Sequence, residues 1–496
     1  MIVHPRPSAA GLLRLGNGQR AAPSNVKLPL FCKTYSSIRY LYYKIVCCFA
    51  FLSSPHLSLA MRLSFFSSHI QAAVREYTVH STCKQNQAIR SFHSTQLRRT
   101  GMTSAILTAV VTSPEHLSAQ PAEARDKAHH NKTGKGFNNP WPSYYEWKAT
   151  EILGKIIWMR LTGKWKTPDT TPPTVPVRTP KFLQTRQTNR LRTTFLGHAC
   201  YYVEFPGGLR VLFDPVFTDR CSPFSFMGPK RYTEMPCQID ELPYIDAVCI
   251  SHSHYDHLSY PTVLKIAEKY PNVQFFVPLG NQAWFDKIGI RNVTELDWWE
   301  ERSLTLSVSD ATASAPAKSG NTSNTRDEIT ATIGCLPCQH TSGRTPFDKS
   351  RTLWASWSVI SGGKKLWFGG DTGYRKVPEV PDGEWDYGEK YKDLPHCPAF
   401  AQIGDLRGPF DLGLIPIGAY DPRWIMSPMH ANPYDSVNIF ADTKCERALG
   451  MHWGAWVLTT EEVMDPPKVL KQAMKWKGWD EEGIFDVCDI GESREF

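Results

Sequence analysis

The segment SHSHYDHLS, residues 251–259, holds three histidines and one aspartate within six consecutive positions. His252, His254, Asp256 and His257 follow the pattern H-x-H-x-D-H. Imidazoles this close repel one another when protonated and fill a core poorly, so a shared metal ion is the natural reason for the cluster. A purely structural histidine cluster is the weaker interpretation, because such groups are rarely buried without partners. The pattern therefore predicts a metal centre.

Three further residues of ligand type stand, like this cluster, just after apolar, strand-like runs. CLPCQH ends in His340, LWFGGD ends in Asp371, and ALGMHWG contains His452. Either histidine alone would be interpreted as a hydrogen-bonded core residue, but their shared position at strand ends favours ligation. Two ions bridged by a carboxylate suit phosphoester hydrolysis. The expected zinc ligands are His252, His254 and His340 for one ion, Asp256, His257 and His452 for the other, and Asp371 for both.

These positions need elements that bring them together. After residue 180 the chain shows short strand-like runs that end in turn residues, with helical stretches between several of them. The runs are RTTFLGH, CYYVEFPGGLRVLFDP, DAVCISH, VQFFVPLG, LWFGGD, LGLIPIG and RALGMHWG, and the helical stretches are YPTVLKIAEKY, NPYDSVNIFADTK and PPKVLKQAMKW. Strands that alternate with helices predict layered α/β or αββα packing.

Composition divides the chain into three parts. Residues 1–135 show no sustained period and are expected to be a largely disordered leader. The first 100 residues hold thirteen Lys and Arg but one acid, Glu76, which is typical of a mitochondrial transit segment. An over-extended translation start, with Met61 or Met102 as the true beginning, is the alternative. Residues 136–180 contain a helix and a connector, and residues 181–496 form the catalytic domain.

An apolar stripe from Ala149 predicts an amphipathic helix. Its members are Ile152, Leu153, Ile156, Ile157 and Leu161. Trp147, Trp158 and Trp165 flank it and Lys164 and Lys166 add positive charge. This composition would suit a membrane interface, although docking on the protein's own domain is the simpler interpretation. TPDTTPPTVPVRTP, residues 167–180, predicts an extended connector.

The charge balance and the cysteines indicate which classes of function and which compartment fit the chain. The formal net charge of +8 belongs to the first 100 residues, since the rest carries 43 basic and 47 acidic side chains. This balance argues against a general nucleic-acid-binding protein. The 13 cysteines show no regular framework, which fits an intracellular, reduced setting, and we expect the C-x-x-C pair Cys335 and Cys338 to be structural. No segment reaches the roughly 20 apolar residues that span a bilayer.

Two stretches interrupt the strands and are expected to be surface loops. They are SDATASAPAKSGNTSNTRDE, from Ser309, and RKVPEVPDGEWDYGEKYKDLPH, from Arg375. The second lies directly behind Asp371, where it could line or cap a cleft.

At these motifs the sequence resembles the metallo-β-lactamase-fold phospholipases, in particular the N-acyl-phosphatidylethanolamine-hydrolysing phospholipase D family. The resemblance extends from about Asn139 to Phe496. It rests on NPWPS, FLGHA, SPFSFMGPKRY, LPYIDAVCISHSHYDHLSY, VPLG, LDWWEE, LWASWSV, GGDTGY, GPFDLGLIPIGAYDPRW and HWGAW. It implies a four-layered αβ/βα metallo-β-lactamase sandwich with a binuclear zinc site at one edge.

The resemblance implies the same seven zinc ligands, of which Asp371 and Asp256 could also orient the attacking water. It adds His430 in MSPMHANP, where the family carries a histidine near the substrate phosphate. His198, in FLGHA, is expected to be structural or to support a ligand from behind. The implied reaction converts N-acyl-phosphatidylethanolamine to phosphatidic acid and an N-acylethanolamine. The implied setting is a homodimer, peripheral on an internal membrane, with an apolar cleft for acyl chains.

Other functions are compatible with parts of this pattern. Another hydrolase of the same fold, either lactonase-like or acting on soluble phosphodiesters, would use the same metals. A lipid-binding scaffold that has lost catalysis would be expected to lack ligands, whereas all seven positions are filled here. An RNA-processing nuclease is disfavoured because residues 101–496 have no basic excess.

Overall fold

Neighbouring side chains along the central strands are buried on opposite faces of one sheet. In β3 (Cys200–Glu204), Tyr201 and Val203 belong to one apolar core, whereas Tyr202 belongs to another. Successive side chains of a strand point to opposite faces, so both faces of this sheet are covered. Such burial is typical of a sheet packed between helices and a second sheet.

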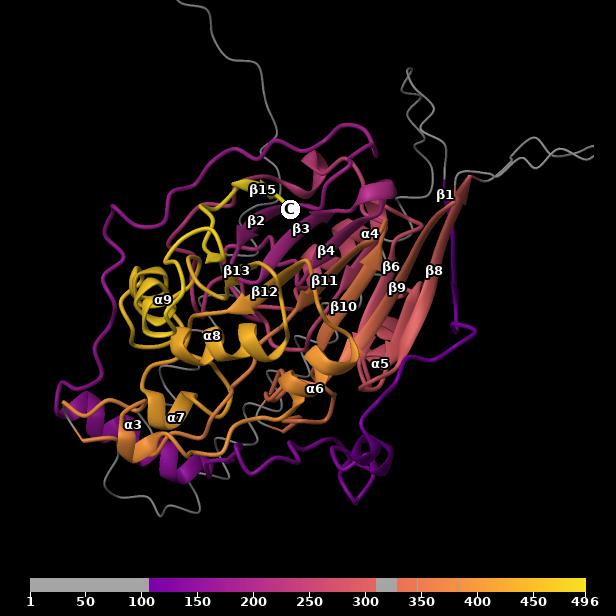
Figure 1. Ribbon diagram of the computed structural model, residues 1–496. Coiled ribbons are helices and arrows are strands. Elements are labelled where there is room, and N and C mark those ends of the chain that lie inside the picture. Colours follow the sequence, from indigo (N-terminus) through magenta and orange to yellow (C-terminus); the bar gives the residue numbers. More distant parts are fainter. Residues whose placement is uncertain (1–106, 309–327, 346, 382) are drawn as a thin grey trace, which may run out of the picture. The chain divides into compact units, whose positions relative to one another are not determined.

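The computed structural model describes residues 107–308, 328–345, 347–381 and 383–496, and their strands form two mixed sheets (Figure 1). The eight-stranded sheet has the order β1 (Leu107–Thr112), β8 (Glu301–Val308), β9 (Ile329–Leu336), β10 (Ser356–Ser361), β11 (Lys364–Phe368), β12 (Leu412–Pro416), β13 (Ala448–Met451) and β14 (Phe485–Asp486). The seven-stranded sheet has the order β15 (Ser493–Glu495), β2 (Arg192–Gly197), β3, β4 (Arg210–Phe213), β5 (Ala247–Cys249), β6 (Gln274–Pro278) and β7 (Val293–Leu296).

Helices cover the outer face of each sheet. The seven-stranded sheet packs against α4 (Tyr260–Lys269) and α5 (Gln282–Lys287). The eight-stranded sheet packs against α6 (Ala399–Leu406), α8 (Pro433–Asp442) and α9 (Asp465–Trp476), which lie in front of it in Figure 1. The short helices are α7 (Arg423–Met426), η2 (Ala122–Asp126), η3 (Pro206–Gly208), η4 (Ile239–Glu241) and η5 (Glu389–Tyr391). The predicted four-layered sandwich is confirmed.

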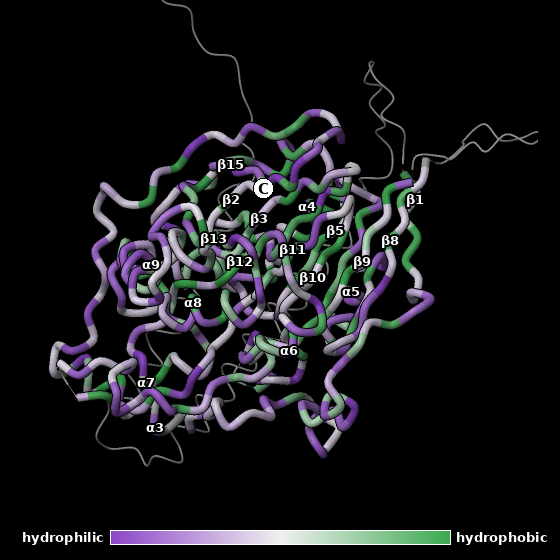
Figure 2. The backbone as a smooth tube through the Cα atoms, in the orientation of Figure 1, coloured by the Kyte–Doolittle hydropathy of each residue, from purple (hydrophilic) through white to green (hydrophobic). Residues whose placement is uncertain are grey.

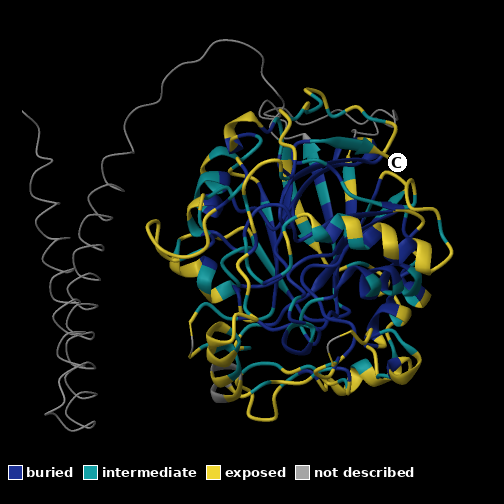
Figure 3. Ribbon diagram, turned by 90° about the vertical axis from the view of Figure 1, so that its left-hand side faces the viewer, coloured by how far each residue is buried: buried dark blue, intermediate teal, exposed yellow. Residues whose placement is uncertain are grey.

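The two layers of strands enclose the main core. Hydrophobic residues, green in Figure 2, follow the strands, and Figure 3 shows the buried residues gathered between outer helices and loops. The predicted strand runs form β2–β6 and β11–β13, and the predicted helical stretches form α4, α8 and α9. Cys335 and Cys338 are buried members of this core, as their expected structural role requires.

The predicted end of the leader at residue 135 is wrong, because the fold begins earlier in the chain. Residues 107–135 were expected to be disordered, but β1 pairs antiparallel with β8 from Leu107–Val308 to Thr112–Ser303. The sequence LTAVVT is β-prone and only six residues long, too short to show a sustained period, and it gains its partners from a strand almost 200 residues later. The proposed transit segment and both alternative starts lie outside the described residues.

The predicted amphipathic helix forms α3 (Ala149–Leu161), in which Ile156 of the apolar stripe is half-buried. Lys155 contacts the rest of the protein, with its Nζ 2.9 Å from Glu379 Oε2 and 4.1 Å from the ring centre of Trp424. Ile157 and Leu161 of the apolar stripe are 49% and 80% exposed. The side chains of Ile152 and Leu153, and all but the last residue of the insert from Ser309, lie outside the described part. No helix in that part is long and apolar enough to cross a membrane.

Candidate metal centre

The ligand-type residues all follow the carboxyl ends of strands. The H-x-H-x-D-H segment follows β5, His340 follows β9, Asp371 follows β11 and His452 follows β13. Strands β11, β12 and β13 are parallel, and β9 runs in the same direction because β10 is antiparallel to both β9 and β11. The residues of the eight-stranded sheet therefore meet at one edge, opposite the loop that follows β5 in the other sheet.

The first ligand group consists of His252, His254 and His340. His252 Nε2 and His340 Nε2 lie 2.8 and 3.3 Å from His254 Nδ1. All three ligand nitrogens lie within 4.8 Å of one another. Three imidazole nitrogens that converge in this way match the three-histidine sites that hold zinc.

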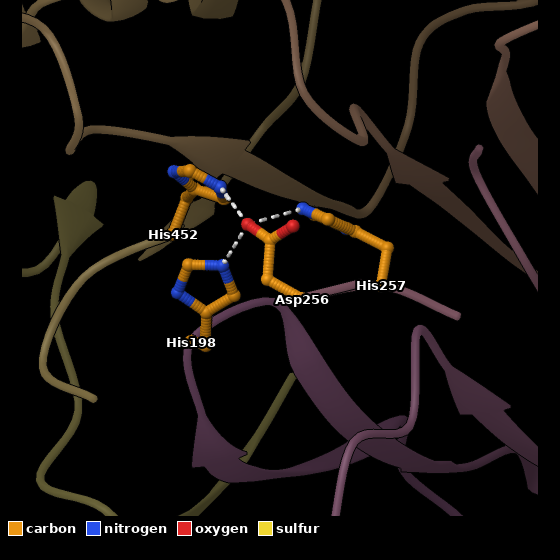
Figure 4. Close-up of side chains that lie close together, drawn as sticks. All are labelled: His198, Asp256, His257 and His452. Atoms are coloured by element: carbon orange, nitrogen blue, oxygen red, sulfur yellow. Dashed lines mark hydrogen bonds and ion pairs between the residues drawn. The ribbon is translucent and has the colours of Figure 1, made fainter. Parts of the chain in front are cut away.

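The second group consists of Asp256, His257 and His452, with His198 beside it (Figure 4). The Nε2 atoms of His257 and His452 both lie 3.5 Å from Asp256 Oδ2. His198 Nε2 lies 3.0 Å from the same oxygen. Figure 4 shows the three rings aimed at this carboxylate from three segments of the chain. His198 thus contacts a ligand-type residue, as the sequence predicts.

Asp371 stands between the two groups. Its Oδ2 lies 3.0 and 3.1 Å from the Nε2 atoms of His452 and His257. The same oxygen lies 3.6 and 3.8 Å from the Nε2 atoms of His340 and His252. This is the position expected of a carboxylate shared by two ions.

Unpaired buried atoms test whether these residues fit a metal. Asp371 Oδ1 is buried without a hydrogen-bond partner among the residues that the structure describes, and the buried Nε2 atoms of His257 and His452 have only carboxylate oxygens beside them, the nearest at 3.1 and 3.0 Å. An imidazole nitrogen that faces a carboxylate oxygen needs a proton or a cation between them, and an unpaired buried oxygen costs about 1–3 kcal/mol, so the arrangement fits a metal ion. A second group of ligand type, His129, His130 and Asp297, differs because both imidazoles and Lys127 bond its carboxylate. Only the first arrangement calls for a metal.

Bonds behind the ligands fix which imidazole nitrogen faces the centre. His257 Nδ1 lies 2.6 Å from Asp214 Oδ2, and His340 Nδ1 lies 2.9 Å from the carbonyl oxygen of Met429. Ser251 donates its hydroxyl to Asp214 and lies 2.9 Å from His252 Nδ1. When Nδ1 donates its proton outward, Nε2 keeps the lone pair that a metal needs.

Asp214 is the residue of this site that sequence reasoning missed. It is the next-to-last residue of the run RVLFDP and follows β4 directly, a strand that is parallel to β5. Its φ of 38° lies in the left-handed region, and its carboxylate also accepts from the backbone amide of Ser251 at 2.7 Å. The sequence signal that could have pointed to Asp214 is its position directly after a strand-like run, the same position that the H-x-H-x-D-H segment has after β5.

The electrostatics suit a cation between the groups. Burial lowers the pKa of His252 and His340 well below the usual value. Burial opposes ionisation of Asp371, but His257 and His452 hold its pKa well below the usual range. Burial also opposes protonation of His452, yet Asp371 raises its pKa to about 9. Asp371, Asp256 and Asp214 also raise the pKa of His257 despite its burial, so without a metal, protons on His257 and His452 would offset the carboxylates, and metal binding would release them.

His430 lies beside both groups, in the loop between α7 and α8. Its ring centre is 5.0 Å from that of His340 and 5.2 Å from that of His452. Its Nδ1 is buried and unpaired among the described residues. Burial lowers the pKa of His430 to about 4, so the ring is neutral at neutral pH. The structure therefore brings the predicted substrate-binding histidine to the edge of the centre.

Residues 209–453 match the family described as Beta-lactamase superfamily domain. N-acyl-phosphatidylethanolamine-hydrolyzing phospholipase D 1 of Caenorhabditis elegans is 34% identical over 375 residues, which cover 73% of this chain and 92% of the worm protein. An uncharacterised protein of Mycobacterium tuberculosis is 33% identical over 76% of this chain and 86% of its own length. The mitochondrial N-acyl-phosphatidylethanolamine-hydrolyzing phospholipase D of Saccharomyces cerevisiae is 34% identical over 58% of this chain and 52% of its own length.

Proposed function

The chain belongs to the N-acyl-phosphatidylethanolamine-hydrolysing phospholipase D family of the β-lactamase superfamily, and from this premise we propose that it hydrolyses N-acyl-phosphatidylethanolamine to phosphatidic acid and an N-acylethanolamine. One observation carries the proposal. Four imidazole nitrogens from the two ligand groups surround a single oxygen of Asp371. A hydrolase of this fold needs such a centre to cut a phosphodiester bond.

The cofactor in this proposal is a pair of zinc ions. The donor set of five imidazoles and two carboxylates suits zinc better than magnesium or calcium, which prefer oxygen ligands. His252, His254 and His340 would hold one ion, Asp256, His257 and His452 the other, and Asp371 both. When bound, zinc lowers the pKa of water towards neutrality and acts as a Lewis acid on phosphate oxygens.

The protein's own residues would orient the reaction. Asp371 and Asp256 are ionised and would accept hydrogen bonds from the attacking water, which fixes its direction towards phosphorus. His430 is neutral, so we assign it as a hydrogen-bond donor to a phosphate oxygen rather than as a cation. Donation to the departing ethanolamide oxygen is its second role in the proposal.

The proposed setting is a homodimer at the surface of an internal, mitochondrial membrane. Ile157, Trp158 and Leu161 of α3 are exposed beside basic residues, which supports attachment to a lipid surface. The basic composition of the first 100 residues supports a mitochondrial location, as does the mitochondrial yeast relative. The proposal that the chain forms a homodimer rests on the family resemblance.

The proposal is tested with the full chain loaded with zinc and supplied with N-acyl-phosphatidylethanolamine in mixed micelles. Mass spectrometry would identify the products, with Asp371→Asn as the control variant. We expect phosphatidic acid and N-acylethanolamine from the wild type and neither from the variant. Hydrolysis of soluble phosphodiesters alone, with the lipid left intact, would instead assign a soluble-substrate phosphodiesterase.

A further inference from the structure

Three apolar side chains project from the connection between β4 and β5. Phe224, Phe226 and Met227 are 44%, 76% and 55% exposed. They stand within four residues of one another, and the rings of the two phenylalanines lie 5.6 Å apart. A cluster of exposed apolar side chains is typical of a surface that binds a membrane, another protein or a ligand.

The segment that carries them is held in a defined shape. Arg220 and Lys230 form an antiparallel β-bridge that closes a loop, here called the apolar loop, of residues 220–230. The Cys221 amide donates to the carbonyl of Pro229 at 3.3 Å, and the Arg220 side chain donates to the carbonyl of Gly228. Because the base is fixed, less of the loop has to be ordered when its apolar tip binds.

The base of this loop adjoins the metal centre. The guanidinium of Arg231 lies 4.3 Å from the ring centre of Trp456, and the indole of Trp456 donates to the carbonyl of Asp219 at 3.2 Å. The Trp456 ring lies 4.9 Å from that of His198, which bonds Asp256. One aromatic side chain thus separates the base of the apolar loop from the residues around the second ligand group.

The charges around the tip suit a phospholipid surface. No acidic residue lies between Arg220 and Lys230, and Lys230 is exposed. Asp219, just outside the loop, is 3.8 Å from Lys230 and offsets part of its charge. An apolar tip above basic side chains can enter the acyl layer while the cations meet lipid phosphates.

We propose that the apolar loop inserts Phe224, Phe226 and Met227 into the phospholipid bilayer that carries the substrate. Arg220 and Lys230 would then lie at the level of the phosphates, and the adjoining metal centre would face the headgroup region. This inference rests on the proposed function, because a lipid substrate presents its phosphodiester at that depth. The occupant is the bilayer itself, not a second copy of the chain.

The test compares the full-length wild type with a triple variant, Phe224→Ser, Phe226→Ser and Met227→Ser. Leu117→Ser is the matched control, since Leu117 is 72% exposed and belongs to the segment after β1. Binding is measured by co-sedimentation with vesicles of phosphatidylcholine and phosphatidylglycerol that contain no N-acyl-phosphatidylethanolamine. Salt of about 0.5 M screens the charge of the leader. Hydrogen exchange reports protection of residues 220–230, and hydrolysis of a short-chain, monomeric N-acyl-phosphatidylethanolamine reports the chemistry.

We expect the triple variant to lose roughly tenfold or more in vesicle binding, because three apolar side chains no longer enter the lipid. Hydrolysis of the monomeric substrate should stay within about twofold, and vesicles should protect the apolar loop in the wild type. Unchanged vesicle binding by the triple variant would overturn the proposal. Protection that depends on protein concentration, without vesicles, would instead assign the surface to a second copy. A wild type that binds vesicles through this loop but hydrolyses no lipid would refute the proposed function alone.

Discussion

The environment of Asp371 suits a bound metal cation. Its Oδ2 contacts imidazoles of both ligand groups, while its Oδ1 is buried without a partner in the described part of the chain. A proton shared with His257 or His452 could balance one charge, but the other unpaired atoms would remain. The two metal ions of the proposal would neutralise this charge and bind the remaining atoms.

At this scale we predict that Asp371→Asn lowers turnover more than about a hundredfold, because the neutral amide can no longer bridge two cations. The substitution keeps the volume of the side chain, so the fold should persist. Initial rates on the micellar lipid measure the first effect, and far-ultraviolet circular dichroism measures the second. Turnover near that of the wild type would refute the bridging assignment.

Asp214 is predicted to act through His257. Asp214→Asn should weaken zinc binding about 10–100-fold, because the Nδ1 hydrogen bond that orients the imidazole loses its charged acceptor. Competition with a chromophoric chelator measures the affinity. Asp240→Asn is the control, since Asp240 is an exposed acid paired with Lys265. Equal affinities in both variants would show that Asp214 does not support the centre.

Residue types and spacing pointed to seven candidate ligands, which the structure brings together, because H-x-H-x-D-H is dense and the other three residues follow strong apolar runs. Asp214 is not part of a dense motif of this kind, since it lies 37 positions before Ser251, its partner in the structure. His430 was found through the resemblance alone. A single histidine after a short helix has no pattern of its own, and only tertiary packing brings its ring to His340.

At the scale of elements, the stretch after Tyr374 is the surface loop that its composition predicted, since most of its described residues are exposed, but ion pairs hold parts of it in place. Arg375 is buried and its guanidinium Nε lies 3.2 Å from Asp435 Oδ1 in α8. Asp386 accepts from the Nε of Arg423 in α7 at 2.9 Å. These ion pairs tie the stretch to the two helices on either side of His430. Charged residues that pair only in the fold look like solvated ones in the sequence, so composition did not show these ion pairs.

The start of α8 supports the same loop. Asn432 accepts a hydrogen bond from the Asp435 amide at 2.9 Å, and the Asp435 side chain accepts from the Asn432 amide, forming a capping box. We predict that Asn432→Ala lowers the free energy of unfolding by about 1 kcal/mol, because the helix loses its cap. Urea denaturation measures the change. Asn432→Asp should lose less, since aspartate also caps helices, and equal losses would refute the capping role.

At the scale of the whole described unit, the segment before α3 belongs to the fold. Lys127, His129 and His130 all contact the carboxylate of the buried Asp297, at 3.0, 2.7 and 2.8 Å. Trp141 stacks on Trp298 with ring centres 5.4 Å apart. The sequence could not show this, because each contact joins positions more than 150 residues apart. The composition of this segment is typical of a loop, although the segment packs against the rest of the described unit.

This contact set predicts a dependence of stability on pH. Burial would raise the pKa of Asp297, but its bonds to His129 and Lys127 hold it well below the usual range. The unfolded chain therefore takes up the proton first as the pH falls. The stability that the carboxylate supplies is complete above the unfolded pKa of about 4 and is lost as the pH falls below it.

The measurement is the urea midpoint of the wild type and of Asp297→Asn between about pH 3 and pH 7. We expect the wild type to be the more stable above about pH 5, and the difference to shrink below about pH 4. A difference that grows as the pH falls would contradict the assignment. Lys392→Gln is a control, since Lys392 pairs with Glu389 at the surface.

The central claim is a two-zinc centre built around Asp371, and a crystal of the zinc-loaded protein tests it most directly by anomalous diffraction at the zinc edge. We expect two peaks on either side of Asp371, each about 2.0–2.3 Å from its ligand atoms. One should contact His252, His254 and His340, and the other Asp256, His257 and His452. A single peak, or peaks away from these residues, would contradict the account.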